Sequence, residues 1–124
     1  MTVKTLTAED FESTVLTSPI VLVDFWATWC GPCRAFAPVF ERSSQSHPDI
    51  VYAKVDTDAE RELAAAVGIR SVPTIMAFRD GILVYSQPGA MSPAVLDDLI
   101  DQVKGLDMEQ VRAKIAERKA AVKA

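Results

Sequence analysis

Two cysteines separated by two residues are the groups in this chain best suited to covalent chemistry. Cys30 and Cys33 follow an apolar run and open an expected helix. Free N–H groups and the positive end of the helix dipole favour a thiolate at such a position, so we expect a reactive thiolate near neutral pH. The spacing also allows the two sulfurs to reach bonding distance. We therefore predict thiol–disulfide exchange, in which Cys30 attacks a substrate disulfide and Cys33 resolves the mixed disulfide.

A metal site or an inert buried pair is the alternative interpretation of the cysteines. One Cys-x-x-Cys unit supplies two ligands, and the only histidine, His47, cannot complete a four-ligand zinc site. A zinc ion shared between two chains would need a dimer. His47 precedes Pro48 at the end of an expected helix, where a solvated cation is ordinary. We expect no metal site.

Two charged residues interrupt apolar strands. Asp24 lies among Val, Phe and Trp residues, and burial there should raise the pKa of its carboxyl group. The strand ends just before the cysteines, so Asp24 could lie beneath Cys33 and exchange a proton with it. A buried carboxyl group satisfied by backbone or water is the alternative. Lys54 is either a surface lysine or a charge partner of Asp24.

A proline stands immediately before an expected strand. Pro73 follows Val72 and removes a donor from the sheet, which suggests a cis peptide bond or a deliberate turn. An ordinary trans loop proline is the alternative, which the frequency of X–Pro isomers favours.

Length and composition restrict the classes of protein that this chain can be. It has 124 residues, of which 49% are hydrophobic and 24% charged, which fits one packed domain. Its formal charge of −4 argues against nucleic acid as a partner. No apolar run approaches a membrane span, and no secretory signal is visible, so we expect a cytoplasmic protein that does not bind membranes.

Strand-like and helix-like segments alternate along the chain, which predicts an α/β domain with parallel crossovers followed by an antiparallel hairpin. The first helix should be capped by Thr7 and carry Phe11, Val15 and Leu16 on its apolar face. Pro38 should kink the second helix. The expected strands are residues 2–5, 20–26, 50–56, 74–78 and 82–85, and the expected helices are 7–18, 33–46, 60–67 and 92–104.

The C-terminal segment differs from the body in charge. From Asp107 onward it holds five basic and three acidic residues, a net charge of +2, whereas the preceding residues carry −6. Asp107 and Gln110 resemble a capping box, and apolar residues at helical spacing follow: Met108, Val111, Ile115 and Val122. We expect an extra amphipathic helix, which packs on its own domain, docks a partner or mediates self-association; packing is the favoured role.

The chain resembles the thioredoxin family. The matching segments are Val23-Asp24-Phe25-Trp26, Trp29-Cys30-Gly31-Pro32-Cys33, Ala37-Pro38, Lys54-Val55-Asp56, the run from Gly68 to Thr74, and Gly89-Ala90. They occur in order up to about Lys104. The resemblance implies a thioredoxin fold: a central mixed five-stranded sheet flanked by four helices, plus the extra C-terminal helix. We therefore divide the chain into a thioredoxin domain, residues 1–105, and a helical extension, 106–124.

The resemblance also assigns roles to individual residues. It makes Cys30 the exposed nucleophile, Cys33 the resolving thiol and Asp24 the proton-transfer partner of Cys33, with Lys54 tuning Asp24. It makes Pro73 a cis proline facing the cysteines. The implied polypeptide-binding groove is lined by Trp29, Gly31, Pro32, Val72, Gly89 and Ala90.

The expected activity is that of a protein-disulfide reductant that maintains cytoplasmic redox homeostasis. The resemblance implies no bound cofactor beyond the redox-active disulfide, and an NADPH-dependent flavoprotein thioredoxin reductase as electron donor. Disulfide-containing target proteins are the other expected partners, and we expect a monomer. A reductant dedicated to one partner and a non-enzymatic scaffold are the competing hypotheses. An oxidant or isomerase fits the Gly-Pro dipeptide less well.

Overall fold

A run of buried β-branched and aromatic residues forms the central strand of the sheet. The structure is a computed structural model that describes residues 2–123. Strand β2 (Ile20–Trp26) lies between β3 (Val51–Asp56) and β4 (Thr74–Arg79). Strand β1 (Val3–Thr5) and strand β5 (Ile82–Pro88) form the edges, which gives the order β1-β3-β2-β4-β5. The first three strands in this order are parallel, and β4 and β5 are antiparallel to their neighbours. The mixed five-stranded sheet is confirmed.

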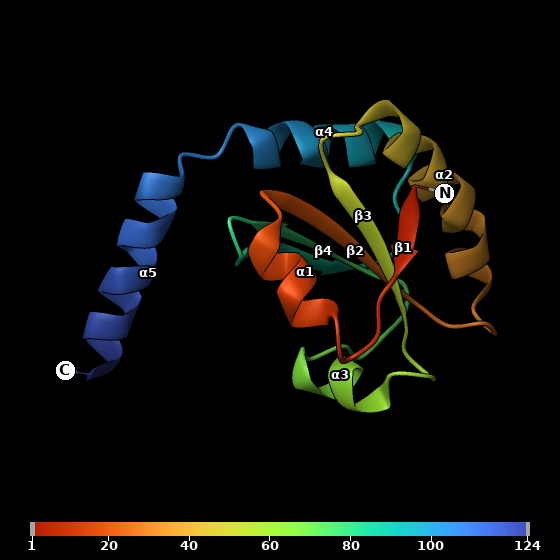
Figure 1. The fold of residues 1–124 in the computed structure, drawn as a ribbon, viewed down its shortest axis with the longest axis horizontal. Helices are drawn as coiled ribbons and strands as arrows, with labels where there is room; N and C mark the ends of the chain where they lie inside the picture. Colours follow the sequence, from red (N-terminus) through yellow and green to blue (C-terminus); the bar gives the residue numbers. More distant parts are fainter. Residues whose placement is uncertain (1, 124) are drawn as a thin grey trace.

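Helices cover both faces of this sheet (Figure 1). Helices α1 (Phe11–Thr17) and α3 (Arg61–Ala66) lie on one face, where Phe11 and Val15 join a core cluster with Val21, Val23 and Phe25. Helices α2 (Gly31–Ser46) and α4 (Pro93–Lys104) cover the other face with a second cluster, to which Phe36, Phe40 and Leu96 belong. Alternate residues of β2 therefore enter different cores, as the two-residue period of a strand requires.

The first helix begins later than the sequence suggests. Thr7 does not cap it; the N-cap is Asp10. The Asp10 carboxylate accepts hydrogen bonds from the backbone N–H (2.7 Å) and hydroxyl (3.2 Å) of Thr7, so this side chain reaches backward and closes a separate turn. Leu16 is 61% exposed, so its expected place on the apolar face was wrong.

Other boundaries differ by a few residues. Helix α2 starts at Gly31 rather than Cys33 and runs through Pro38 as one helix. Strand β5 continues to Pro88 because it pairs with β4 as far as Thr74. The turn between β4 and β5 follows the expected pattern, since Asp80 and Gly81 have φ values of 54° and 80°.

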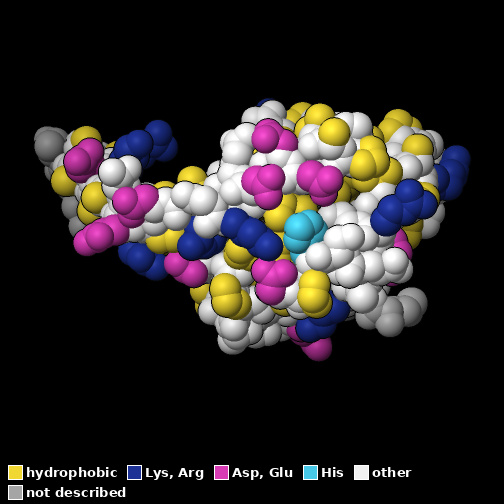
Figure 2. Space-filling model, turned by 90° about the horizontal axis from the view of Figure 1, so that it is seen from above, with side chains coloured by type: hydrophobic (Ala, Val, Ile, Leu, Met, Phe, Trp, Pro, Cys, Tyr) yellow, Lys and Arg dark blue, Asp and Glu magenta, His cyan; other side chains and the backbone are white. Residues whose placement is uncertain are grey.

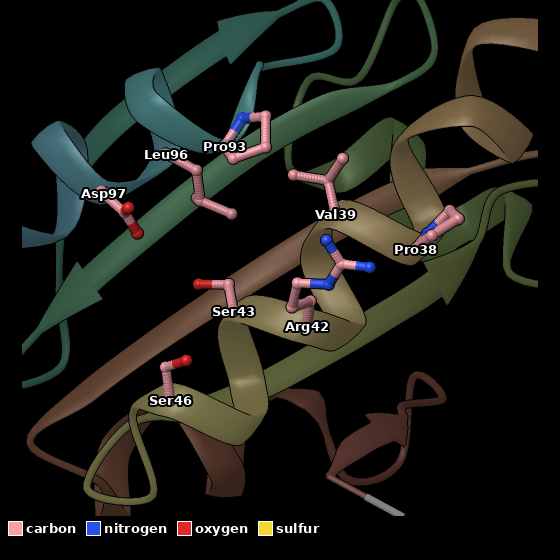
Figure 3. A pocket seen from close by; sticks show the side chains of 8 residues that line it. All are labelled: Pro38, Val39, Arg42, Ser43, Ser46, Pro93, Leu96 and Asp97. Atoms are coloured by element: carbon pink, nitrogen blue, oxygen red, sulfur yellow. The ribbon is translucent and has the colours of Figure 1, made fainter.

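Helix α4 packs beside α2 and leaves a cavity of about 200 Å³ between them. Its N-cap is Ser92, whose hydroxyl accepts the N–H of Val95, as predicted, although the Val95 side chain is exposed. Figure 3 shows Arg42 of α2 and Asp97 of α4 at this cavity. Neither cysteine lines it, so it is separate from the redox motif.

Helix α5 (Met108–Lys123) projects from the body (Figure 1), and Figure 2 shows both basic and acidic side chains on it. Met108 is buried, and Val111 and Ile115 face β5 across a groove of about 230 Å³. Val122 is 87% exposed, so the expected apolar stripe ends before it. Packing therefore involves only the first half of the helix.

An arginine that no sequence pattern singles out holds the joint between α4 and α5. The Arg79 guanidinium, at the end of β4, donates to the carbonyl oxygens of Val103 (2.7 Å), Lys104 (3.1 Å) and Leu106 (3.1 Å). It thus provides a charged donor to carbonyls at the end of α4 and in the turn that follows. A second link joins Arg112 of α5 to Asp80 in the hairpin, at 3.1 Å.

Candidate active site

The two cysteines lie where β2 passes into α2. Cys30 is the N-cap of α2, and Cys33 lies in its first turn, with the two Cα atoms 5.2 Å apart and the sulfurs joined as a disulfide. The backbone N–H of Cys33 points at Cys30 Sγ at 3.1 Å. This is the arrangement predicted from the motif: a free N–H at the start of a helix is directed at the sulfur that must carry negative charge when the pair is reduced.

Cys30 is less accessible than expected. Its residue is 4% exposed and that of Cys33 is 2% exposed, so the description of Cys30 as exposed was wrong for the disulfide state. Both pack in a small cluster with Ala27, Trp26 and Val72. Only a narrow edge of Cys30 is therefore open to solvent, and the surrounding surface controls access to it.

The loop before β4 forms that surface. The peptide bond between Val72 and Pro73 is cis, which confirms the prediction. Cys30 Sγ lies 3.7 Å from the carbonyl oxygen of Val72, so residue 72 adjoins Cys30 directly. The Pro73 carbonyl accepts the N–H of Gly89 at 2.8 Å, and Gly89 has a φ of 107°, which a side chain would disfavour. The loops of residues 72–73 and 89–90 are thus tied together.

Trp29, the residue before Cys30, lies at the surface. It is 68% exposed, and its indole N–H donates to Asp58 Oδ2 at 3.0 Å, which fixes the ring although it is open to solvent. The sequence reasoning missed Asp58; its position two residues after a strand that ends in Asp56 was the available signal. The other expected groove residues, Gly31, Pro32 and Ala90, are exposed at the surface.

Asp24 is buried, as its apolar neighbours predicted. It is 4% exposed, and burial raises the pKa of its carboxyl group from 3.8 to about 7, while the positive charge of Lys54 acts in the opposite direction. Within residues 2–123, Asp24 Oδ1 has no hydrogen-bond partner. The backbone and side chains of residues 2–123 therefore do not satisfy this carboxyl oxygen, which was one form of the alternative interpretation.

Asp24 and Lys54 lie side by side on the parallel strands β2 and β3. Both line a cavity of about 380 Å³, together with Arg34 and Ala37 of α2. The Lys54 ammonium lies 5.6 Å from the centre of the Trp26 ring, and no ion pair with Asp24 forms among residues 2–123. No hydrogen bond joins Asp24 to Cys33 in the same part of the chain. The cavity opens beside Ala37, one helical turn beyond Cys33.

A metal centre finds no support in this geometry. Among residues 2–123, no group of three or more His, Cys, Asp or Glu side chains could hold a metal ion. His47 is the C-cap of α2, at the opposite end of that helix from Cys30.

The comparisons with known proteins agree with the fold and the motif. The family model described as Thioredoxin matches residues 2–102. "Putative thioredoxin 2" of Streptomyces coelicolor is 50% identical over 93% of this chain and 86% of its own length. "Thioredoxin 1" of Synechococcus elongatus is 46% identical over 78% of this chain and 92% of its own length. The solved structure of a mutant thioredoxin from Halobacterium salinarum superposes with a TM-score of 0.78 at 34% identity, covering 84% of this chain and 92% of that one.

The chain belongs to the thioredoxin family and is a thiol–disulfide oxidoreductase with a redox-active cysteine pair. It functions as a thiol–disulfide reductant, and its redox group is the protein's own disulfide rather than a bound cofactor. Disulfide-containing targets and a reductase are its partners. Within residues 2–123, no helix is long and apolar enough to cross a membrane. The match to the Streptomyces relative covers so much of the chain that it extends past the family model into α5.

Proposed function

We propose that Cys30 is the attacking and Cys33 the resolving thiol of a protein-disulfide reductase. In the first step, the Cys30 thiolate forms a bond to one sulfur of a target disulfide, and the other target sulfur leaves as a thiolate. The observation that carries this assignment is the placement of Cys30 Sγ at the helix start, 3.7 Å from the Val72 carbonyl, whereas Cys33 lies deeper.

In the second step, the Cys33 thiolate attacks Cys30 Sγ. The Cys30–Cys33 disulfide forms, and the target sulfur that was bonded to Cys30 leaves as a thiolate with the electron pair of the broken bond. Two electrons and, overall, two protons thus pass to the target. Asp24 accepts the proton of the Cys33 thiol through the adjoining cavity, with Lys54 favouring the ionised carboxylate. A carboxyl group with a pKa of about 7 can both accept and release a proton near neutral pH.

The target polypeptide binds in the groove predicted around the disulfide. The exposed Trp29 ring, Gly31, Pro32, Val72, Gly89 and Ala90 form its sides, and the Val72 backbone lies beside Cys30 Sγ, where it can meet the target. The tie between Gly89 N–H and the Pro73 carbonyl supports a single groove rather than two independent loops.

We assign the reductase partner to the NADPH-dependent flavoprotein class, and the protein to the cytoplasm as a monomer that acts on many targets. The family resemblance supports these assignments. A scaffold role, the non-enzymatic alternative, would leave the cysteines dispensable; a reductant dedicated to one partner would use α5 as its specificity device.

Trapping of the mixed disulfide tests the two cysteine roles. Reduced Cys33→Ser protein, mixed with an oxidised peptide disulfide, should accumulate a covalent adduct at Cys30, measured by mass spectrometry after peptide mapping. The matched Cys30→Ser protein should form little adduct, because its remaining thiol, Cys33, is the less exposed of the two and is not the helix N-cap. Adduct formation mainly at Cys33 would reverse the assignment, and no adduct in either variant would contradict the mechanism.

We also propose that residues 1–105 form the thioredoxin domain and that residues 106–124 are an extension, the first half of which packs on it. The contacts of Arg79, Arg112 and the half-buried Val111 and Ile115 support the packing role. Removal of the residues after Gly105 should lower the melting temperature and leave the kinetics of peptide disulfide reduction unchanged. Unchanged melting with altered kinetics would instead support a partner-docking helix.

A further inference from the structure

A second cavity, of about 270 Å³, lies beside the redox site on the α3 side. Trp29 and Val72, which flank Cys30, form its inner wall. Ala64, Ala65 and Ile69 supply apolar lining, and Arg61 and Arg70 also line the cavity. A target bound along Val72 therefore places the residues next to its own cysteine within reach of this cavity.

The two arginines come from different elements, and among residues 2–123 they have no acidic partner. Arg61 is the first residue of α3, and Arg70 lies in the loop that leads to Val72. Both are exposed, and neither forms an ion pair or a side-chain hydrogen bond among residues 2–123. They line the same cavity as Trp29 and Val72, in a chain whose net charge is −4.

The neighbouring acidic side chains are engaged elsewhere. Asp58 accepts the indole N–H of Trp29, and Asp56 Oδ1 accepts the backbone N–H groups of Asp58 and Ala59. Glu60 accepts the backbone N–H of Ala8 at 2.8 Å. The carboxylates of this loop thus hold the backbone and Trp29 in place, and the guanidinium groups remain available to a ligand.

We propose that this cavity is a subsite for an acidic side chain of the target, next to its disulfide cysteine. This inference rests on the proposed reductase function and adds a substrate class to it. The planar guanidinium group matches a carboxylate in a two-point hydrogen bond, and the apolar lining accommodates the methylene groups of a glutamate. Arg61 and Arg70 are binding residues that select targets and take no part in the exchange of sulfur bonds.

The test uses two peptide disulfides that are identical except for the residues flanking the cysteine, Glu in one and Lys in the other. The second-order rate constant for reduction of each peptide by the reduced protein is measured at about 0.01 M and about 1 M salt. Two exposed ion pairs predict about tenfold faster reduction of the Glu peptide at low salt. This preference should shrink at high salt, where the screening length falls to about 3 Å.

The Arg61→Gln/Arg70→Gln variant should lose most of the preference, and each single variant part of it. The matched control is Arg42→Gln/Arg118→Gln, which removes the same charge at the α2–α4 cavity (Figure 3) and on α5, and should keep the preference. Because each result is a ratio of two rates for one protein, a general change in activity cancels.

Equal rates for both peptides with the original protein would overturn the proposal, as would the same loss of preference in the distal control. Reduction of the uncharged 2,2′-dithiodipyridine by the original protein separates this failure from failure of the proposed function. If that disulfide is reduced but neither peptide is preferred, the subsite is wrong; if it is not reduced either, the reductase mechanism is wrong.

Discussion

The two ends of the central sheet differ in how well a charged side chain is hydrogen-bonded. At the carboxyl end of β2, Asp24 is buried, and one of its oxygens has no hydrogen-bond partner among residues 2–123. At the other end, Arg79 lies across from Ile20 and donates to three carbonyl oxygens. A buried polar group that lacks partners costs stability, whereas a satisfied one supports its surroundings.

The first end carries the candidate reacting groups, and the second end holds helices in place. The end that holds Asp24 also holds the disulfide and the cis peptide bond, and we propose proton transfer as the role of its charge. The end that holds Arg79 closes α4 and fixes the start of α5. We therefore expect substitutions at the first end to change activity, and substitutions at the second end to change stability alone.

The largest expected effect is at Cys30. Cys30→Ser should lower the rate of peptide disulfide reduction by more than about 10³-fold, the scale on which loss of a covalent nucleophile acts. Its fold should persist, because serine fills nearly the same volume; circular dichroism checks this. Substantial remaining activity in a folded variant would favour the scaffold hypothesis.

Asp24→Asn should raise stability while it lowers activity. The pKa of Asp24 is about 7 in the folded chain against 3.8 ordinarily, so between these values the folded state holds a proton that the unfolded state has released. Stability therefore falls as pH rises from about 4 to 7 and stays lower above pH 7.

The neutral asparagine removes this dependence. We expect Asp24→Asn to be more stable than the original protein at pH 8 by a few kcal/mol, with the difference gone near pH 4. Urea unfolding at the two pH values measures it. The second step of the reductase reaction should slow at the same time; a gain in stability that does not vary with pH would contradict the assigned pKa.

Arg79→Met should be destabilising by about 2 kcal/mol, because three carbonyl oxygens lose a charged donor at a partly buried site. Urea unfolding measures the loss, and peptide reduction kinetics should not change. Arg42→Met, at an exposed arginine, is the matched control and should have little effect. Altered kinetics in Arg79→Met would mean that the two ends of the sheet are coupled.

The smallest expected effect concerns the link to α5. The Arg112–Asp80 pair is partly exposed, so a double-mutant cycle with Arg112→Ala and Asp80→Asn should give a coupling of at most about 1 kcal/mol. Asparagine suits the positive φ of residue 80, which keeps the turn intact. A larger coupling would show that this pair, rather than Arg79, holds the helix.

Local patterns predicted much of the fold. The buried strand β2, the turn at Asp80-Gly81 and the Ser92 cap each depend on residues close together in sequence. The predicted start of α1 was wrong because the Asp10 carboxylate accepts the backbone N–H of Thr7, three residues earlier. A residue pattern cannot show in which direction such a side chain forms its hydrogen bond.

The sequence alone determined the cysteine pair, its position at the start of a helix and the burial of Asp24, because hydrophobic pattern and spacing fix these over a few residues. Only the tertiary structure decided that Cys30 is almost covered, that Trp29 is tied to Asp58 and that Arg79 caps α4. Each of these joins residues distant along the chain, and their meeting depends on how the sheet and helices pack. That packing also brings Arg61 and Arg70 to one cavity with Trp29 and Val72.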